Sequence, residues 1–520
     1  MAKTINEEKV RHIANLARLS LSDKEVKLFT KQLGAVLEYF EKLDEVDTEG
    51  IEPTYQVIDG LENVFREDKV GKSFSSKKAL SQAKKINGDY FVADHVFSKK
   101  TSKDRKNIDR KKIDEYNAIL TEVYEKGTVG HKDLFMTEDV ETTAASHVLD
   151  GYIAHYSSTV VELLEKAGHK TRYKLNNDAW GHGASGENSD YGPTLNPWDK
   201  KLVAGGSSSG SAAVVSTGQV EVATGTDTGG SIRLPASFCN VTSIKPSYGG
   251  LSRYGVIAFG SSLDCPSLMS SSAKTLRKYF NKVFIKDNFD SNTKSKKRDI
   301  KAKGVKKIGI IKEFAGKGND PEIQRTFKEA VKLIINAGYK VEEISLPNAE
   351  LGVAVYYIIA PVETSSNLAR YDGVRFGNGR EYFGAEAKRR IMLGTFTSSE
   401  GYADKYYDKA ARVRTLIIND FKRSFEKVDA LISPVSSILP FKIGQMSKNP
   451  LQLYLVDLYL SAISLSGLPT IALPGGFSKE NLPIGFQIVG PRWSEDSLFD
   501  LAEKYQSLTE WHKRLPNNSG

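Results

Sequence analysis

The first 70 residues carry hydrophobic positions at the spacing of α-helices. Apolar residues recur every three or four positions between 26 and 43, and a shorter stripe consists of Val10, Ile13, Leu16 and Ala17. Ser22 and Glu25 stand just before the longer stripe in the pattern of a capping box. Two helices cannot bury both apolar faces against each other, so this unit is expected to pack on a larger surface.

The rest of the chain changes its pattern twice. Residues 55–98 have little periodicity, which predicts an extended strap along that larger surface. From residue 113 onward, helical stripes alternate with short β-rich runs such as 307–311 and 430–434. The stripes at 160–168 and 324–338 each end in a glycine, as helices commonly do. Such alternation predicts an α/β layer architecture.

Composition indicates a soluble protein of more than one folding unit. The chain has 520 residues, of which 40% are hydrophobic and 26% are charged. The N-terminus has no apolar signal region, and no run approaches the roughly 18 apolar residues that a membrane helix needs. Two cysteines, Cys239 and Cys265, cannot form a disulfide framework. These features predict a cytoplasmic protein without a membrane contact.

Two basic runs account for much of the net charge of +9. They lie at 99–112 and 294–307, and each contains many more lysines and arginines than aspartates. Each run by itself is best explained as a solvated linker or loop. Neither is interleaved with aromatic residues, so the most that they suggest is a weak contact with nucleic acid that is blind to sequence.

Two glycine- and serine-rich loops stand close together near the middle of the chain. The first reads Ala-Gly-Gly-Ser-Ser-Ser-Gly-Ser at 204–211, and the second reads Gly-Thr-Asp-Thr-Gly-Gly-Ser-Ile-Arg at 225–233. A lone Lys-Asp pair that begins with Lys132 lies upstream. With their order and spacing, Lys132, Ser207 and Ser231 resemble the Ser–cis-Ser–Lys triad of the amidase signature family, which hydrolyses carboxamides. The probability that all these features agree by chance is very small.

A histidine-based mechanism fits the sequence less well. Among the eight histidines, His131 adjoins Lys132 and His182 lies in a glycine-rich stretch, but neither belongs to a recognisable Ser/His/Asp pattern. The Gly-Ser-Ser-Ser-Gly run at 206–210 is only a loose match to the nucleophile elbow of α/β-hydrolases. The sequence therefore favours the lysine-based set.

The resemblance implies a role for each residue of the two loops. Ser231 is expected to be the nucleophile, Lys132 a neutral general base in a desolvated site, and Ser207 the proton relay, which follows a cis peptide at Gly206. The expected oxyanion hole consists of backbone N–H groups of Thr228, Gly229 and Gly230. Ser208 is expected to hold the relay, and Asp227 to brace the nucleophile loop. No metal site is expected.

Further motifs resemble one subgroup, the A subunits of the glutamyl-tRNA(Gln)/aspartyl-tRNA(Asn) amidotransferases. They lie at 187–193, 365–375, 388–396 and 467–469, and the resemblance covers most of 113–511. It implies that Arg390 meets the α-carboxylate of glutamine and Asp457 its α-ammonium, close to Tyr356. The implied fold is a mixed, twisted sheet flanked by helices.

The N-terminal part resembles the small C subunit of the same amidotransferases, through residues 4–70 and 77–98. The chain is therefore expected to comprise a C-like helical domain with a strap at 1–98, a basic linker at 99–112 and an A-like amidase domain at 113–520. Ammonia from glutamine would pass to a separate B subunit, which would bind ATP, Mg²⁺ and most of the misacylated Glu-tRNA(Gln) or Asp-tRNA(Asn). The sequence has no phosphate-binding Gly-x-x-x-x-Gly-Lys-Ser/Thr loop and no Cys/His cluster, so no cofactor is expected in this chain.

Two other functions stay open at this point. One is a stand-alone amidase for another carboxamide, which would need neither the arginine–aspartate pair nor the helical unit. The other is a weakly active assembly scaffold. Its support is a set of departures near Lys132: Leu134 where the subgroup usually has asparagine, Tyr-Lys-Leu-Asn at 173–176 instead of Gly-Lys-Thr-Asn, and a shorter lead-in after residue 98.

Overall fold

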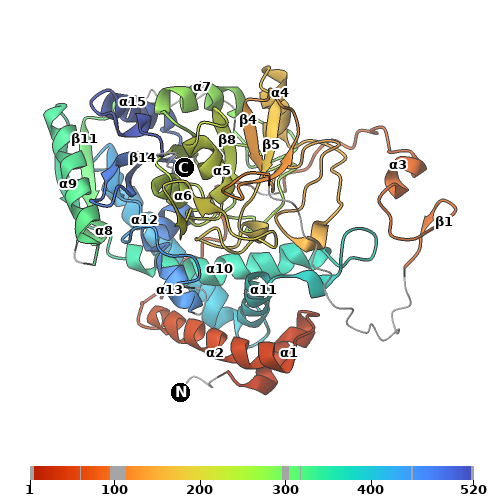
Figure 1. The fold of residues 1–520 in the computed structure, drawn as a ribbon. Coiled ribbons are helices and arrows are strands. Elements are labelled where there is room, and N and C mark those ends of the chain that lie inside the picture. The colour runs from red at the N-terminus through yellow and green to blue at the C-terminus, as the bar shows by residue number, and fades with distance from the viewer. Residues whose placement is uncertain are drawn as a thin grey trace.

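A computed structural model describes residues 5–58, 60–61, 63–93, 113–294, 304–316, 318–446 and 449–516 (Figure 1). The basic run at 99–112 and most of the run at 294–307 lie outside the described residues.

The N-terminal unit consists of α1 (Glu7–Leu16), α2 (Asp23–Phe40) and a short 3-10 turn at Glu41–Leu43. The predicted capping box is present: Glu25 N–H donates to Ser22 Oγ, and Ser22 N–H donates to the Glu25 carboxylate. The longer stripe is buried, including Phe29 and Leu33. In the shorter stripe, Val10 and Ile13 are buried on the apolar face of α1. Leu16, the last residue of α1, is not part of that buried face, because 55% of its surface is exposed.

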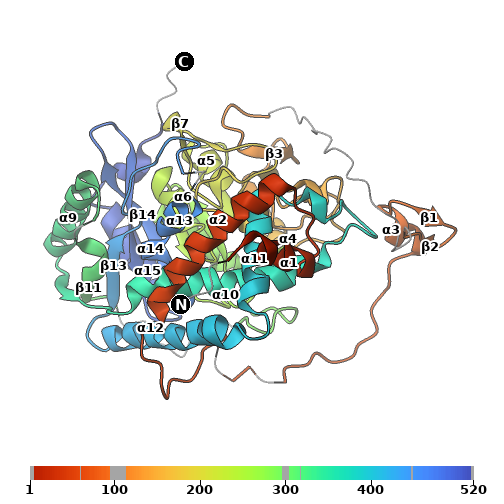
Figure 2. The same ribbon diagram turned by 90° about the horizontal axis from the view of Figure 1, so that it is seen from below.

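The two helices pack on the larger part of the molecule, as their unpaired apolar faces predict. Figures 1 and 2 show α2 lying across α11 (Ala385–Thr397) and α13 (Pro450–Leu455), beside α10 (Gly352–Asn367). Contacts join α1 to α11, and join α2 to α10, α11 and α13. The core of this unit is continuous with that of the helices beneath it.

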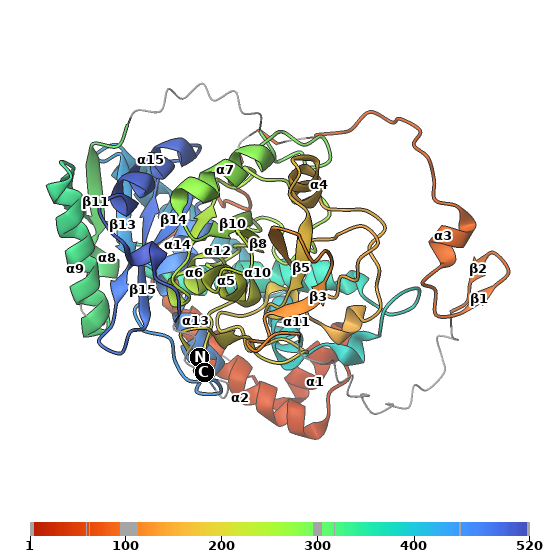
Figure 3. The ribbon, with the colours of Figure 1, turned by 45° about the horizontal axis from the view of Figure 1, so that its top comes forward.

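The strap follows the surface in part. Thr54 N–H donates to Ala411 O at 3.0 Å, and Val57 and Ile58 are buried against Tyr248. It then contains two elements that the sequence pattern did not predict, α3 (Ser76–Leu80) and a hairpin of β1 (Ile86–Asn87) and β2 (Tyr90–Phe91). Figure 3 shows them at the edge of the molecule, where Gln82 donates to Ile153 O.

Among the described residues, eleven strands form one mixed sheet. In spatial order they are β12 (Lys340–Ile344), β11 (Lys307–Ile311), β13 (Ala430–Pro434), β15 (Pro483–Val489), β14 (Thr470–Phe477), β9 (Thr242–Lys245), β10 (Pro266–Ser270), β8 (Val222–Thr226), β4 (Val129–Lys132), β5 (Thr171–Leu175) and β3 (Ile119–Glu122). The β4 strand is parallel to both of its neighbours, β5 and β8, whereas β9, β10 and β14 pair antiparallel. The β-rich runs at 307–311 and 430–434 are confirmed as β11 and β13.

Helices cover both faces of this sheet. The side chains of Val222 and Leu268 join a core with α4 (Thr159–Lys166), α7 (Ala273–Val283), α9 (Pro321–Asn336) and α15 (Glu495–Gln506). The next residues along the strands, Ala223 and Met269, face α5 (Ser209–Ser216) and α6 (Arg233–Phe238) on the opposite side. Outside these lie α8 (Lys312–Ala315), α10, α11, α12 (Lys409–Phe425), α13 and α14 (Leu458–Leu465), and a two-stranded ribbon of β6 (Leu195–Asn196) and β7 (Asp199–Val203). The predicted α/β architecture is confirmed.

This topology brings the candidate residues to one edge of the sheet. Lys132 is the last residue of β4, and the loop that contains Ser231 begins where the parallel neighbour β8 ends. The loop that contains Ser207 connects β7 to the start of α5, and α5 packs on both β4 and β8. The carboxyl ends of parallel strands are where α/β proteins usually place their sites.

Candidate active site

Lys132 is buried among hydroxyl groups. Its side chain has no exposed surface, and its Nζ lies 2.7 Å from Ser207 Oγ, 3.0 Å from Ser208 Oγ and 2.8 Å from Thr226 Oγ1. Burial lowers the pKa of Lys132 to about 7, against the opposing pull of nearby aspartates. Close to neutral pH, this amine can therefore both hold and release a proton.

The backbone fixes the loop of Ser207. The Gly206–Ser207 peptide bond is cis, as the resemblance implies. A Cβ on Gly206 would stand 1.9 Å from Asp178 Oδ2, so only glycine fits. Asp178 is buried and accepts from the N–H groups of Gly186 and Asn188 at 3.1 and 2.8 Å. Its own N–H donates to Ser207 O at 3.1 Å, so Asp178 joins the relay loop to the preceding loop, a role that the sequence pattern did not predict.

The loop of Ser231 is held on its far side by Asp227. The two carboxylate oxygens of Asp227 accept from Arg233 Nε at 2.9 Å and from an Arg233 Nη at 3.0 Å, and Ser464 Oγ donates to the same carboxylate. Arg233 is fully buried and also donates to Leu460 O. Asp227 thus holds the loop through a buried ion pair.

The described part of the structure offers no hydrogen-bond partner to several backbone donors of this loop. In the described part of the chain, the N–H groups of Thr228, Gly229 and Gly230 donate to no protein acceptor. The loop is nevertheless fixed: Thr228 Oγ1 donates to Asp264 at 2.7 Å, and a Cβ on Gly229 would stand 2.5 Å from Tyr356 Cζ. Ser208 N–H donates to Ser231 O at 3.1 Å, which joins the two serine loops. Fixed donors with free N–H groups are what an oxyanion hole needs.

A buried pair of opposite charges lies next to the loops. Arg390 projects from α11, with Nε 2.7 Å from Glu386 Oε1, and its Nη1 has no hydrogen-bond partner among the described residues. Asp457 precedes α14 and accepts from Tyr357 Oη at 2.9 Å. Burial raises the pKa of Asp457 to about 7, although Tyr357 and Arg390 oppose this.

The structure separates the roles of two neighbouring tyrosines. The hydrogen bond to Asp457 comes from Tyr357, whose ring also lies 5.0 Å from the Arg390 guanidinium. Tyr356 lies close to the same pair: burial raises the pKa of its hydroxyl, Arg390 opposes this and Asp457 adds to it, and its ring also covers Gly229. The two rings meet edge to face with centroids 4.9 Å apart, so they bridge the charged pair and the nucleophile loop.

The unusual residues near Lys132 are well packed. Lys174 is fully buried, with Nζ 3.2 Å from an oxygen of Asp133 and 3.0 Å from Thr142 Oγ1. Thr143 donates to the other oxygen of Asp133 through both its N–H and its hydroxyl. Leu134 is buried in the main core. Leu134, one of the departures from the subgroup pattern, is thus buried and packed close to Lys132, and so is Lys174.

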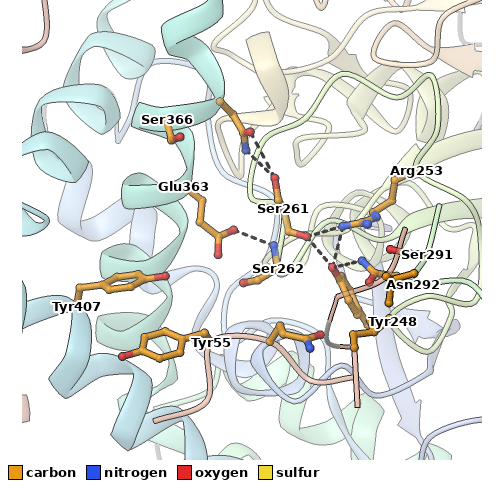
Figure 4. A pocket seen from close by; sticks show the side chains of 14 residues that line it. Tyr55, Tyr248, Arg253, Ser261, Ser262, Ser291, Asn292, Glu363, Ser366 and Tyr407 are labelled. Carbon is orange, nitrogen blue, oxygen red and sulfur yellow. Dashed lines mark hydrogen bonds between the residues drawn. The ribbon is translucent and has the colours of Figure 1, made fainter. Parts of the chain in front are cut away.

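A cavity of about 590 Å³ lies elsewhere, between the strap and the body (Figure 4). It is lined by Tyr55, Tyr248, Glu363 and Tyr407, among others, and by none of the triad or charged-pair residues. Its link to the site is the loop at 259–264, where Ser262 N–H donates to Glu363 and Asp264 holds Thr228. It is therefore not the candidate active site.

The described residues contain no cluster of histidine, cysteine, aspartate and glutamate that could hold a metal ion. They also contain no helix long and apolar enough to cross a membrane.

Two family models match the chain. The Amidase model matches residues 77–499, and the model of the Glu-tRNAGln amidotransferase C subunit matches residues 21–92. The A subunit of the glutamyl-tRNA(Gln) amidotransferase of Chromohalobacter salexigens is 44% identical over 407 residues, which is 74% of this chain and 83% of that protein.

Solved structures agree with this. The crystal structure of the glutamyl-tRNA(Gln) amidotransferase A subunit of Thermotoga maritima aligns with a TM-score of 0.69 and 37% identity, over 78% of this chain and 91% of that one. Kluyveromyces lactis allophanate hydrolase aligns with a TM-score of 0.64 and 27% identity, over 76% of this chain and 63% of that one. The chain therefore belongs to the amidase family, and within it to the A subunits of the glutamyl-tRNA(Gln) amidotransferases, with a C-subunit segment at its N-terminus.

Proposed function

We propose that this member of the amidase family hydrolyses glutamine and supplies the ammonia to a tRNA-dependent amidotransferase. The observation that carries the proposal is the buried Lys132 amine, with a pKa of about 7, in hydrogen-bond contact with Ser207 and next to a loop of free N–H donors. An amine poised in this way can take the proton of a serine nucleophile, which a solvated lysine cannot do at neutral pH.

The proposed reaction proceeds through an ester on Ser231. As Ser231 Oγ attacks the side-chain carboxamide carbon of glutamine, its proton passes through Ser207 to Lys132. The N–H groups of 228–230 stabilise the oxyanion. The proton returns from Lys132 to the leaving nitrogen, the C–N bond breaks, and ammonia departs. Water then hydrolyses the glutamyl ester by the same proton route, which releases glutamate and restores Ser231.

The charged pair is proposed to hold the backbone end of glutamine. Among the described residues, Arg389 and Arg390 both form their ion pairs with a single carboxylate, that of Glu386. The α-carboxylate of glutamine would balance this charge and fill the unpartnered Nη1 of Arg390, while its α-ammonium would pair with Asp457. A stand-alone amidase for another carboxamide would not need this pair, which is why we favour glutamine.

The partners are part of the proposal and come from the resemblance to the amidotransferase subunits. Ammonia would be used by a separate B subunit that binds ATP and Mg²⁺ and presents misacylated Glu-tRNA(Gln), or Asp-tRNA(Asn). Residues 1–98 would act as the C part, 99–112 as a linker and 113–520 as the glutaminase part. The direct test is release of ammonia from glutamine by the purified chain together with its B subunit.

The pH dependence of turnover is expected to report two groups. Lys132 and Asp457 each have a pKa near 7, and both must be deprotonated in the free enzyme. The plot of log kcat/KM against pH should therefore fall below pH 7 with a slope that approaches about two. In the complex the glutamine ammonium lowers the pKa of Asp457, so kcat should fall with a slope of about one. In Asp457→Asn, the slope of kcat/KM should drop to about one. Profiles that are flat between pH 5 and 8 would contradict the assignment.

Arg390→Lys is expected to raise KM for glutamine by about 10- to 100-fold while kcat changes little. Lysine keeps the charge, but it cannot donate to Glu386 and to a carboxylate with one planar fork. Steady-state ammonia release over a range of glutamine concentrations measures this. A KM within twofold of the wild type would remove Arg390 from the glutamine site.

A further inference from the structure

The N-terminal helical unit reaches an arginine next to the glutamine site. Arg389 lies on α11 directly before Arg390, and it is buried against α2. Its Nε donates to Gln32 Oε1 at 3.0 Å, and its guanidinium lies 6.0 Å from the ring centroid of Phe29. Gln32 is itself buried, with 6% of its surface exposed, although α2 has a solvent side where a glutamine could stand at no cost.

A continuous set of polar contacts runs from this point to the candidate glutamine site. Arg389 also donates to one oxygen of Glu386, and the other oxygen of Glu386 accepts from Arg390 Nε. Tyr454 Oη lies 3.3 Å from the same oxygen, and the Tyr454 ring stacks on Tyr357 with centroids 3.7 Å apart. Glu386 thus stands between two arginines, one held by α2 and one facing the site.

The elements that carry these residues share one support. Both α11 and α13, which carries Tyr454, pack against α2. Figure 2 shows α2 crossing both of them. Asp457 follows α13 within two residues, so both charges of the site depend on helices that rest on α2.

We propose that Gln32 is a positioning residue for glutamine: through Arg389 and Glu386 it fixes the Arg390 guanidinium, so that the N-terminal helical unit sets the affinity for the substrate of the neighbouring domain. The inference rests on the proposed function. Its physical reason is that Arg389 and Arg390 share one carboxylate. When Gln32 occupies Arg389 Nε, the orientation of Arg389 is fixed, and Glu386 is held where it can accept from Arg390. Without Gln32, the Arg389 guanidinium, which already donates to Glu386, is free to rotate and can draw that carboxylate away from Arg390.

The decisive variant is Gln32→Leu, assayed as the full chain in complex with the B subunit. It keeps the size of the side chain but removes the acceptor. KM for glutamine is expected to rise by about 3- to 30-fold with kcat within twofold of the wild type, because the arginine is misplaced while the triad is untouched. Arg389→Lys tests the same link from the other side, since lysine has no Nε–H donor, and it should shift KM in the same direction.

The matched control is Glu25→Gln. Glu25 also lies on α2, and its carboxylate pairs at 2.8 Å with Lys388, the residue before Arg389. This substitution removes a polar contact between α2 and α11 but leaves the hydrogen bond between Arg389 and Gln32 in place. Glutamine instead of glutamate preserves the capping box. KM should stay within twofold, and thermal unfolding should show a comparable loss of stability in the two α2 variants.

The outcomes separate the inference from simpler explanations. A raised KM in Gln32→Leu and Arg389→Lys, but not in Glu25→Gln, supports it. An unchanged KM in both Gln32→Leu and Arg389→Lys overturns it. An equal rise of KM in Glu25→Gln also overturns it, because any weakening of the contact between α2 and α11 would then have the same effect. If Gln32→Leu does not fold, Arg389→Lys decides. Wild-type complex that releases no ammonia would instead refute the proposed function itself.

Discussion

Ser231→Ala is expected to abolish release of ammonia from glutamine, with kcat reduced by about 10⁴-fold or more. Ser231 stands in a loop that is fixed by the Asp227–Arg233 pair and by Thr228, so removal of one hydroxyl leaves the loop and its N–H donors in place. The loss should therefore come from chemistry and not from unfolding. Ammonia release is measured with the purified chain and its B subunit, beside circular dichroism and co-purification of the two proteins.

This experiment also separates the proposed function from the scaffold alternative. In the glutaminase, the variant still binds the B subunit, and amidation of tRNA still proceeds when ammonium salt replaces glutamine. In a scaffold, the wild type and the variant would release ammonia equally slowly. Substantial turnover by Ser231→Ala would mean that another residue is the nucleophile.

Lys132→Met is expected to lower kcat by about 10³- to 10⁴-fold. Methionine fills a similar volume, but it cannot take a proton from Ser207 at the 2.7 Å contact that Lys132 makes. The remaining activity should lose the fall in kcat below pH 7, because the group whose pKa is about 7 is gone. The kcat–pH profile of the variant measures this.

The control for Lys132→Met is Lys174→Met. Lys174 is also a fully buried lysine, one strand away on β5, but it pairs with Asp133 and hydrogen-bonds to neither Ser207 nor Ser231. Its replacement should reduce stability while the fall in kcat below pH 7 stays. If that fall persists in Lys132→Met, Lys132 is not the titrating base.

Local patterns predicted those parts of the molecule that depend on neighbouring residues. The capping box at Ser22 and Glu25, the helices that end near Gly168 and Gly338, and the strands at 307–311 and 430–434 are set within a few positions of the chain. The glycine–serine loops are equally local, and their resemblance to known proteins led directly to Lys132, Ser207 and Ser231. Leu16 shows the limit: a residue can continue a stripe and still end a helix in solvent.

Contacts between distant parts of the chain could not be predicted in this way. Nothing near Tyr357 in the sequence indicates that its hydroxyl, and not that of Tyr356, meets Asp457, because the helix phase that decides it depends on how α10 packs on α14. The hydrogen bond that Arg389 donates to Gln32 likewise joins residues 357 positions apart in the chain. The local sequence shows only a glutamine three residues after Phe29, on the apolar side of the helix, which does not indicate its partner.

The docking of α1 and α2 on α11 has a consequence for how the protein behaves at low abundance. Two separate polypeptides that meet at such a seam come apart when they are diluted below their dissociation constant, and each then exposes an apolar face. Here both sides of the seam belong to one polypeptide, so their encounter is intramolecular and does not weaken on dilution. The ratio of the two parts is fixed at synthesis, and neither can accumulate as an orphan that aggregates or is degraded.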